Sequence, residues 1–267
     1  MSIGSGIEEK INDWFAAKAG INCIRGHFFY KPALGRDSIV VDLGGNKGSF
    51  SKGISEMFRC KVFAVEPEPN LFRQIPEMEG VKKFSYAISG EDSPVTLYLS
   101  DNPEANTIDP GIQKIGEHKQ SVTVQGKTLE NFLKEIGIAS VDLLKVDIEG
   151  AEIAMFKSVG DDLLRNIKQI SIEAHAFLRK GDEAYAKPYS ELTQRLKKTG
   201  FDLSPFGRKS VDMLFLNKKS MKIKFIHRLF TYPAVFLQFL LLLTRGAKGC
   251  FLSPKGSSVL GDEHEEK

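Results

Sequence analysis

The sequence predicts an α/β protein built on a doubly wound, mostly parallel sheet. Short runs rich in Val, Ile and Leu, which are typical of strands buried on both faces, alternate along the chain with stretches of helical periodicity. The clearest run, residues 39–43, leads directly into a cluster of glycines, as a parallel strand does where the chain turns into a helix. This alternation favours a parallel sheet that is covered by helices on both faces.

The elements are expected in the order in which the apolar runs occur. A closing hairpin is expected after the last parallel strand, and the predicted strands cover residues 39–43, 61–65, 83–88, 141–146, 169–173, 202–204 and 211–216. Residues 49–58 are predicted to form a helix after the glycine cluster. Thr128 is predicted to cap a second helix that ends at Gly137, and a third helix ends at Gly200. Residues 101–120 are polar, contain Pro and Gly, and are predicted to form a long surface loop.

Composition and charge favour one large domain with appendages. The chain has 267 residues, of which 42% are hydrophobic and 27% are charged, so it can bury a sizeable core. A net charge of only +3 gives no signal for polyanion binding, so nucleic acid is not expected as a partner. The predicted organisation is a helical lead-in, the α/β domain, a basic and hydrophobic helical appendage and a polar, disordered tail, over residues 1–38, 39–217, 218–252 and 253–267.

The cysteines and the N-terminal residues favour a cytoplasmic location. Cys23, Cys60 and Cys250 are far apart and lack the spacing of metal ligands, which is simplest to explain in a reducing compartment. Glu8 and Glu9 lie where a signal peptide would need an apolar run. We therefore expect the protein in the cytoplasm.

The sharpest motif is the glycine run at residues 42–48 (DLGGNKG), which follows the first strand. Its glycines let the backbone turn tightly and approach a ligand closely. Glu66 ends the next predicted strand, eighteen residues after Gly48. A carboxylate at that position can accept hydrogen bonds from both hydroxyls of a ribose. The glycine run and Glu66 together predict a nucleoside pocket at the carboxyl ends of parallel strands.

The acid that opens the glycine run distinguishes between two nucleoside ligands. A dinucleotide site favours a loop without an acid, because that loop must hold a pyrophosphate at a helix N-terminus. Here Asp42 opens the run, and the Gly-x-Gly-x-x-Gly spacing is absent. S-adenosylmethionine carries a sulfonium and an ammonium but no phosphate, so a nearby carboxylate suits it better. The alternative interpretation is a plain strand-to-helix turn without a ligand.

A second group of polar residues lies in the run 142–152 (DLLKVDIEGAE). The fourth strand is predicted to end near Val146, which places Asp147 and Glu149 at the ligand-binding edge of the sheet. Lys145 and Asp147 project to one side of the strand, and a charged residue inside a buried strand needs a partner. We therefore expect Lys145 to form a salt bridge within the site. Glu149 and Glu152 can alternatively be acids that stabilise a helix N-terminus.

A third group closes the fifth strand. Glu173 and His175 point to the same side of that strand, and a histidine there can take a proton from a substrate hydroxyl. The alternative is a structural or merely exposed histidine. Asp147 and Glu173, at the ends of two adjacent strands, can alternatively hold a divalent metal ion that lowers the pKa of the hydroxyl. The remaining histidines have no comparable setting; these are His27, His118, His227 and His264.

At these motifs the sequence resembles the FkbM family of methyltransferases. The resemblance covers roughly residues 39–216, and its most family-specific block is 143–152. The matching segments, in order, are residues 40–48, 64–67, 86–89, 127–133, 142–152 and 172–175. One departure is the pair Gly45-Asn46, where many members of the family have a different pair. The resemblance implies a seven-stranded, Rossmann-like class I methyltransferase fold that uses S-adenosylmethionine as the methyl donor.

The resemblance also implies roles for individual residues. It implies that Asp42, Gly44 and Gly48 line the methionine end of the cofactor and that Glu66 binds its ribose. Gly45, Asn46 and Ala87 complete the predicted cofactor-binding set. Asp147 is placed beside the reacting centre, and the usual reaction is O-methylation of a hydroxyl on a sugar or a secondary metabolite. A glycolipid precursor is a further candidate acceptor for this chain.

Several alternatives stay open at this point. The catalytic candidates are Asp147, His175 and Glu149, with Asp147 or His175 as the base. A dehydrogenase that uses NAD is the second enzyme class, against which the glycine spacing argues. A non-catalytic scaffold that binds S-adenosylmethionine is a third possibility, against which the retained acidic and histidine candidates argue. The sequence leaves the acceptor and the oligomeric state open.

The C-terminal appendage is expected to lie on a membrane surface. Residues 218–228 are basic, and residues 229–244 carry no charge. A helix of that uncharged length spans about 24 Å, which is short of the roughly 30 Å hydrocarbon core. Contact through residues 223–245 would favour a lipid-linked acceptor at the cytoplasmic face. Packing of the helix against the domain or a second copy, and true spanning, are the alternatives.

Overall fold

A seven-stranded sheet forms the centre of the molecule. The computed structural model describes residues 13–102, 105–113, 118–174, 183–206, 211–225, 227 and 229–231. Within this part of the chain the strand order is β11-β12-β10-β9-β3-β4-β5, and β12 alone runs antiparallel to its neighbours. The strands are β3 (Ile39–Leu43), β4 (Lys61–Val65), β5 (Val81–Phe84), β9 (Leu143–Val146), β10 (Gln169–Glu173), β11 (Phe201–Leu203) and β12 (Asp212–Asn217). The doubly wound, mostly parallel sheet and its closing hairpin are confirmed.

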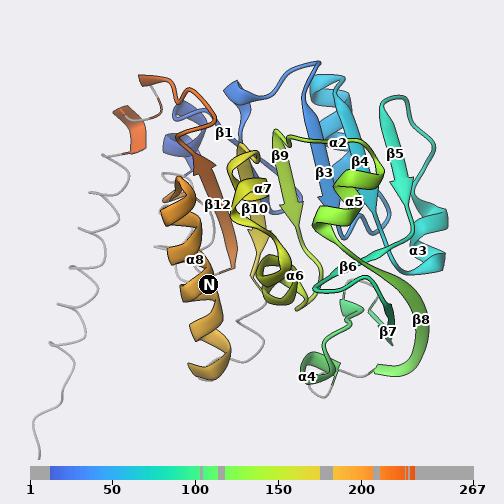
Figure 1. The fold of residues 1–267 in the computed structure, drawn as a ribbon. Coiled ribbons are helices and arrows are strands. Elements are labelled where there is room, and N and C mark those ends of the chain that lie inside the picture. The colour runs from blue at the N-terminus through green and yellow to red at the C-terminus, as the bar shows by residue number, and fades with distance from the viewer. Residues whose placement is uncertain are drawn as a thin grey trace, which may run out of the picture.

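Helices cover one face of this sheet, and a mixed layer covers the other (Figure 1). The first face carries α5 (Leu129–Glu135), α6 (Glu152–Ser158), α7 (Asp161–Arg165) and α8 (Glu183–Thr199), which pack on the sheet in one large apolar cluster. The opposite face carries α2 (Ser49–Phe58), whose Phe50 and Ile54 pack with Val40, Val62 and Leu143. The short helix α3 (Pro69–Gln74) follows β4. The predicted helix ends at Gly137 and Gly200 are confirmed, and both glycines have positive φ.

Strand alternation decides which residues face α2. In β3, Val41 and Leu43 belong to the apolar cluster under α5 to α8, and in β9 Leu144 and Val146 do the same. The residues between them therefore project to the opposite side of the sheet, since successive side chains alternate along a strand. Asp42 and Lys145 are two of these, and they are register neighbours on adjacent strands. The sheet itself therefore brings the two charges together.

A second, three-stranded sheet differs from the expectation for this region. It consists of β6 (Ala87–Ser89), β8 (His118–Thr128) and β7 (Pro94–Ser100), with α4 (Pro110–Gln113) between β7 and β8. The predicted strand over 83–88 is thus two strands in different sheets, because β5 leaves the main sheet after Phe84. The predicted loop over 101–120 is shorter than expected. Its last residues begin β8, whose alternating Val122 and Val124 pair with β7 over Val95–Leu97.

The N-terminal lead-in is not simply helical, which corrects the prediction for residues 1–38. Residues 13–18 are helical, but β1 (Ile21–Ile24) and β2 (His27–Tyr30) then form an antiparallel hairpin, followed by the 3₁₀ turn η1 (Lys31–Ala33). The connection is Arg25-Gly26, and both residues have positive φ. Two-residue hairpin turns of this kind need left-handed backbone at both positions, which the glycine supplies readily. The hairpin covers the α2 face of the sheet beside β10.

The first part of the C-terminal appendage packs on this lead-in. The Lys224 amide donates to the Tyr30 hydroxyl at 3.0 Å, and the His227 Nδ1 lies 2.9 Å from the carbonyl oxygen of Ala19. Phe230 packs on the apolar cluster that contains Tyr30. Most of residues 218–252, and all of the tail 253–267, lie outside the described residues. In the part of the chain that the structure describes, no helix combines the length and apolar character needed to cross a membrane.

Candidate active site

The sheet changes its winding direction between β3 and β9. The chain steps from β3 to β4 and β5 on one side, then crosses to β9 and β10 on the other. In open α/β sheets, ligands bind in the crevice at the carboxyl ends of the two strands where this reversal occurs. The glycine run follows β3 and Asp147 follows β9. The glycine run and the motif that contains Asp147 therefore meet at the topological switch point.

The glycine run forms a tight loop against the end of β9. Gly44, Asn46 and Gly48 all have positive φ, and the Gly44 and Gly45 amides donate to the Val65 carbonyl at 3.0 and 2.9 Å. A Cβ on Gly44 would lie 1.8 Å from the carbonyl oxygen of Asp147, so only glycine fits there. The close backbone approach holds the loop and the end of β9 in one rigid unit. A ligand that binds to the loop thereby lies next to Asp147.

Glu66 braces the glycine loop from the end of β4. Its Oε2 accepts from the Asn46 amide at 2.8 Å and its Oε1 accepts from the Glu68 amide at 2.9 Å. Each carboxylate oxygen has two lone pairs, so both oxygens can still accept a hydroxyl. The side chain is buried, and burial raises the pKa of Glu66 to about 7 although the two amides and Lys145 oppose the shift. Glu66 thus braces the loop and keeps acceptor capacity for a hydroxyl donor.

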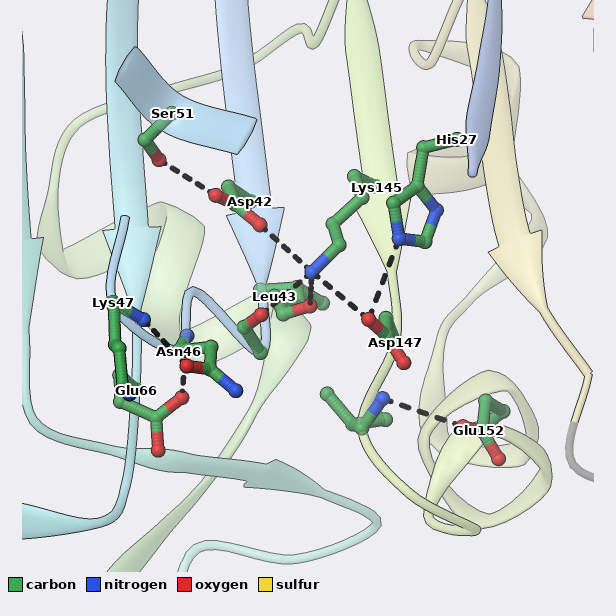
Figure 2. A network of polar contacts seen from close by, with 12 residues as sticks. His27, Asp42, Leu43, Asn46, Lys47, Ser51, Glu66, Lys145, Asp147 and Glu152 are labelled. Atoms are coloured by element: carbon green, nitrogen blue, oxygen red, sulfur yellow. Dashed lines mark hydrogen bonds and ion pairs between the residues drawn. The ribbon is translucent and has the colours of Figure 1, made fainter. Parts of the chain in front are cut away.

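A buried ion-pair network lies beneath the loop (Figure 2). The Lys145 ammonium lies 3.1 Å from Asp42 Oδ1 and 3.4 Å from Asp147 Oδ2, and it donates to the Gly44 carbonyl at 2.6 Å. The Ser51 hydroxyl donates to the other oxygen of Asp42 at 2.6 Å. Burial alone would lower the pKa of Lys145, but the charges of Asp42 and Asp147 outweigh it and the pKa is raised. The expected salt bridge of Lys145 within the site is confirmed.

A histidine that the sequence did not single out joins this network. His27 Nε2 lies 3.3 Å from Asp147 Oδ2, and its ring packs edge-on against Phe50. His27, Asp147 and Glu173 each offer a ligand atom, and these atoms lie within 4.8 Å of one another. His27 comes from β2, far from the motifs in sequence, so no local pattern links it to Asp147. The pair Arg25-Gly26 is typical of a two-residue hairpin turn, and it is the signal in the sequence for the hairpin that carries His27.

The loop after β9 separates Glu149 from Glu152. The Glu152 carboxylate is buried, accepts from the Ile148 and Gly150 amides at 3.3 and 3.2 Å, and accepts from the Tyr189 hydroxyl at 3.0 Å. Glu152 therefore fixes the loop at the start of α6. Glu149 has a positive φ, and its carbonyl accepts a hydrogen bond from Thr107. The Glu149 carboxylate is not part of the cluster that His27, Asp147 and Glu173 form among the described residues.

The remaining predicted site residues occupy different places. Ala87 is buried at the start of β6, where it pairs with Gly126 of β8. Glu173 lies at the end of β10, one residue beyond the pair Ile172–Val146, and therefore beside Asp147 on the next strand. His175 lies outside the described residues.

The strand order defines a class I methyltransferase fold, and the glycine loop and Asp147 lie at its switch point. Residues 42–203, more than half of the chain, match the family model described as the methyltransferase FkbM domain. The chain belongs to this FkbM family. This family assignment agrees with the resemblance drawn from the motifs.

Three curated relatives illustrate the range of the family. The chain is 30% identical over 207 residues to AMB antimetabolite synthetase AmbE of Pseudomonas aeruginosa, with 63% of this chain and 10% of that protein covered. It is 29% identical over 178 residues to Methyltransferase 1 of Beauveria bassiana, covering 58% of this chain and 71% of the relative. It is 23% identical over 133 residues to the 2-O-methyltransferase NoeI of Sinorhizobium fredii, covering 43% of this chain and 55% of the relative. The chain thus spans only a tenth of the length of AmbE.

Proposed function

We propose that the protein transfers a methyl group from S-adenosylmethionine to a hydroxyl of a sugar, glycolipid precursor or other small acceptor. The observation that carries this proposal is the joining of two motifs at the switch point. The loop of residues 42–48 abuts the end of β9 at the Gly44–Asp147 contact. A cofactor on the loop and an acceptor beside Asp147 would be neighbours, and alignment of the two reacting groups is much of what methyl transfer requires.

The cofactor half of the site fits S-adenosylmethionine in two respects. Glu66 keeps acceptor capacity for ribose hydroxyls while it holds the loop through the Asn46 amide. Asp42 and Asp147 bring two carboxylates to the buried network around Lys145, and carboxylates suit a ligand that carries a sulfonium and an ammonium. The cofactor supplies a methyl group that is already activated for transfer. The protein then has to bind it, exclude water and deal with the proton of the acceptor.

The acceptor half supports a hydroxyl substrate. Asp147 lies at the loop and is partly open to solvent, with about a fifth of its side chain exposed, so an acceptor can reach it. The name of the relative NoeI is that of a 2-O-methyltransferase, which favours oxygen as the accepting atom. We assign Asp147 to the reacting centre. The alternative candidates from the sequence, His175 and Glu149, come second to it.

Calorimetry and product analysis test the proposal. S-adenosylhomocysteine should bind the purified full-length chain, and NAD⁺ should not. Cell extract incubated with the enzyme and labelled S-adenosylmethionine should yield a labelled product one CH2 unit heavier than its precursor. Asp147→Asn should leave S-adenosylhomocysteine binding intact and lower turnover by about a hundredfold. Binding of NAD⁺ alone would favour the oxidoreductase, and cofactor binding without any turnover would favour the scaffold.

We also propose that the protein contacts an anionic membrane surface, which would favour a lipid-linked acceptor. The packed N- and C-terminal segments expose apolar side chains, with Trp14 53%, Phe225 77% and Leu229 48% accessible. Lys222 and Lys224 are exposed beside Phe225. Exposed aromatic residues next to lysines favour the interface of a membrane with anionic headgroups. The uncharged run that continues to residue 244 adds to this preference.

A further inference from the structure

We propose that His27, Asp147 and Glu173 form a binding site for a divalent cation of the Mg²⁺ or Mn²⁺ class. Three separate elements supply these groups: the hairpin strand β2, the end of β9 and the end of β10. His27 lies outside residues 42–203, which match the family model. The site therefore depends on a segment that the family motif does not include.

The spacing of the three groups suits one metal ion. The His27 Nε2 and Asp147 Oδ2 are 3.3 Å apart, and all three ligand atoms lie within 4.8 Å of one another. Bonds of about 2.0–2.2 Å around an octahedral ion place neighbouring ligand atoms roughly 3 Å apart and opposite ones a little over 4 Å apart. Small side-chain rotations are enough to bring this arrangement to bonding distance.

The orientation of His27 favours a metal ligand over a general base. Its Nδ1 is buried and has no hydrogen-bond partner, so an acceptor hydroxyl cannot reach that nitrogen. The other nitrogen, Nε2, is the one directed at Asp147. His27 can therefore act at the site only through the atom that lies among the other two ligand groups. The side chain is held there by the covering hairpin, where only 3% of the residue is exposed.

The charge around the site also favours a cation. Asp42, Asp147 and Glu173 lie on the same side of three adjacent strands, and Lys145 pairs with Asp42 and Asp147. Asp212 of β12 is the antiparallel register partner of Glu173, which sets two carboxylates opposite each other. Carboxylate ligands favour Mg²⁺ and Mn²⁺, and the imidazole is compatible with Mn²⁺.

The role of the cation in turnover rests on the proposed function, although its binding does not. A cation at this site would lower the pKa of a nearby acceptor hydroxyl. In the transfer, the acceptor oxygen forms a bond to the methyl carbon and the carbon–sulfur bond breaks. The electron pair of that bond stays on sulfur, and the hydroxyl proton passes to water. Asp147 would then be a ligand of the metal ion and, through its contact with Gly44, a neighbour of the cofactor.

Electron paramagnetic resonance of bound Mn²⁺ tests the site on the full-length chain after treatment with EDTA and desalting. We expect stoichiometric Mn²⁺ binding with a nitrogen coupling from imidazole in pulsed spectra. His27→Gln should abolish the coupling, and Asp147→Asn and Glu173→Gln should each weaken binding at least tenfold. Asp162→Asn, a change at an exposed surface acid, is the control and should bind normally.

Binding of S-adenosylhomocysteine, measured on the same samples, separates this inference from the proposed function. Variants that bind it normally are folded at the switch point, so their loss of Mn²⁺ reports on the ligands. Absence of Mn²⁺ binding to the wild-type chain, or binding that none of the three substitutions weakens, would overturn the metal site. Failure of the wild-type chain to bind S-adenosylhomocysteine would instead contradict the proposed function and leave the Mn²⁺ result to stand on its own.

Discussion

Glu66 is the residue at which burial and ligand binding oppose each other most directly. Its raised pKa, about 7, means that the unliganded carboxyl is partly protonated near neutral pH. The folded-state value lies above that of an unburied glutamate. The protonated Glu66 carboxyl therefore adds to the free energy of unfolding at acid pH, and this contribution is lost as the pH rises through 7. A ribose that donates two hydroxyl hydrogens favours the ionised form and reverses that preference.

The first prediction follows from this opposition. S-adenosylhomocysteine should bind more tightly as the pH rises through 7, by about tenfold between pH 6 and pH 8, because the ionised carboxylate is the better acceptor. Titration calorimetry in two buffers of different ionisation enthalpy should also detect proton release on binding. In Glu66→Gln, which cannot ionise, affinity should be lower and nearly independent of pH. The same pH dependence in wild type and variant would assign it to another group.

Lys145 is the residue on which the buried charges depend. It neutralises Asp42, which is completely buried on the neighbouring strand. Removal of one partner of a buried ion pair leaves an uncompensated charge, which is far more damaging than the loss of a surface pair. The ion pair is therefore a condition for the fold at the switch point as well as a feature of the site.

We predict that Lys145→Met destabilises the protein by about 3–5 kcal/mol in urea unfolding. The matched control is Lys168→Met, which removes the 40% exposed ammonium that pairs with Asp142, the residue before β9. That change should lower the free energy of unfolding by less than about 1 kcal/mol. Equal effects of the two substitutions would contradict a special role for the buried network.

The elements of the site are joined at points of close backbone approach. The loop after β3 and the end of β9 meet where Gly44 faces the Asp147 carbonyl. The hairpin β1–β2 is fastened to the sheet by Gln169, whose side chain accepts from the Tyr30 amide at 2.8 Å. The first contact places the glycine loop beside Asp147, and the second places His27 there. Positions of this kind are sensitive to a single added methyl group.

A glycine series tests the element contact. Gly44→Ala combines a positive φ with a clash against backbone and should destabilise the protein by more than about 2 kcal/mol and abolish cofactor binding. Gly137→Ala has a positive φ but open space, so about 1–2 kcal/mol is expected with normal binding. Gly35→Ala has neither constraint and should be nearly neutral. Cofactor binding that survives Gly44→Ala would show that the loop can move away from β9.

At the scale of the whole molecule, the N- and C-terminal segments form one apolar cluster beside the sheet. Ala16, Ala19 and Tyr30 pack with Leu214 of β12 and Phe230. This packing supports one alternative that the sequence left open for the start of the appendage, which is contact with the domain. The same segments expose Trp14, Phe225 and Leu229 on their outer side. The buried side chains of these segments therefore pack on the domain, and the exposed ones are available for the proposed membrane contact.

Flotation with liposomes tests the proposed membrane contact. The full-length protein should float with vesicles that contain phosphatidylserine and remain at the bottom of the gradient with neutral vesicles, since the exposed lysines favour anionic headgroups. Phe225→Glu should reduce flotation by placing a negative charge at the exposed position. Met57→Glu is the control, because Met57 is an exposed apolar residue on α2, away from both termini. Failure of the full-length protein to float would reject the membrane contact.

The sequence by itself determined the sheet, the glycine loop, the acids at the strand ends and the family. Local signals carry these features: apolar runs mark β3, β4, β9 and β10, and the spacing from Gly48 to Glu66 reflects one helix-loop-strand unit. The Lys145 salt bridge was also predictable, because a buried charge needs a partner. Only the tertiary structure placed His27 beside Asp147 and Glu173, since packing of the hairpin on β10 leaves no periodic trace in the chain. It also decided that Glu152, through the amides of its loop and Tyr189, fixes the start of α6.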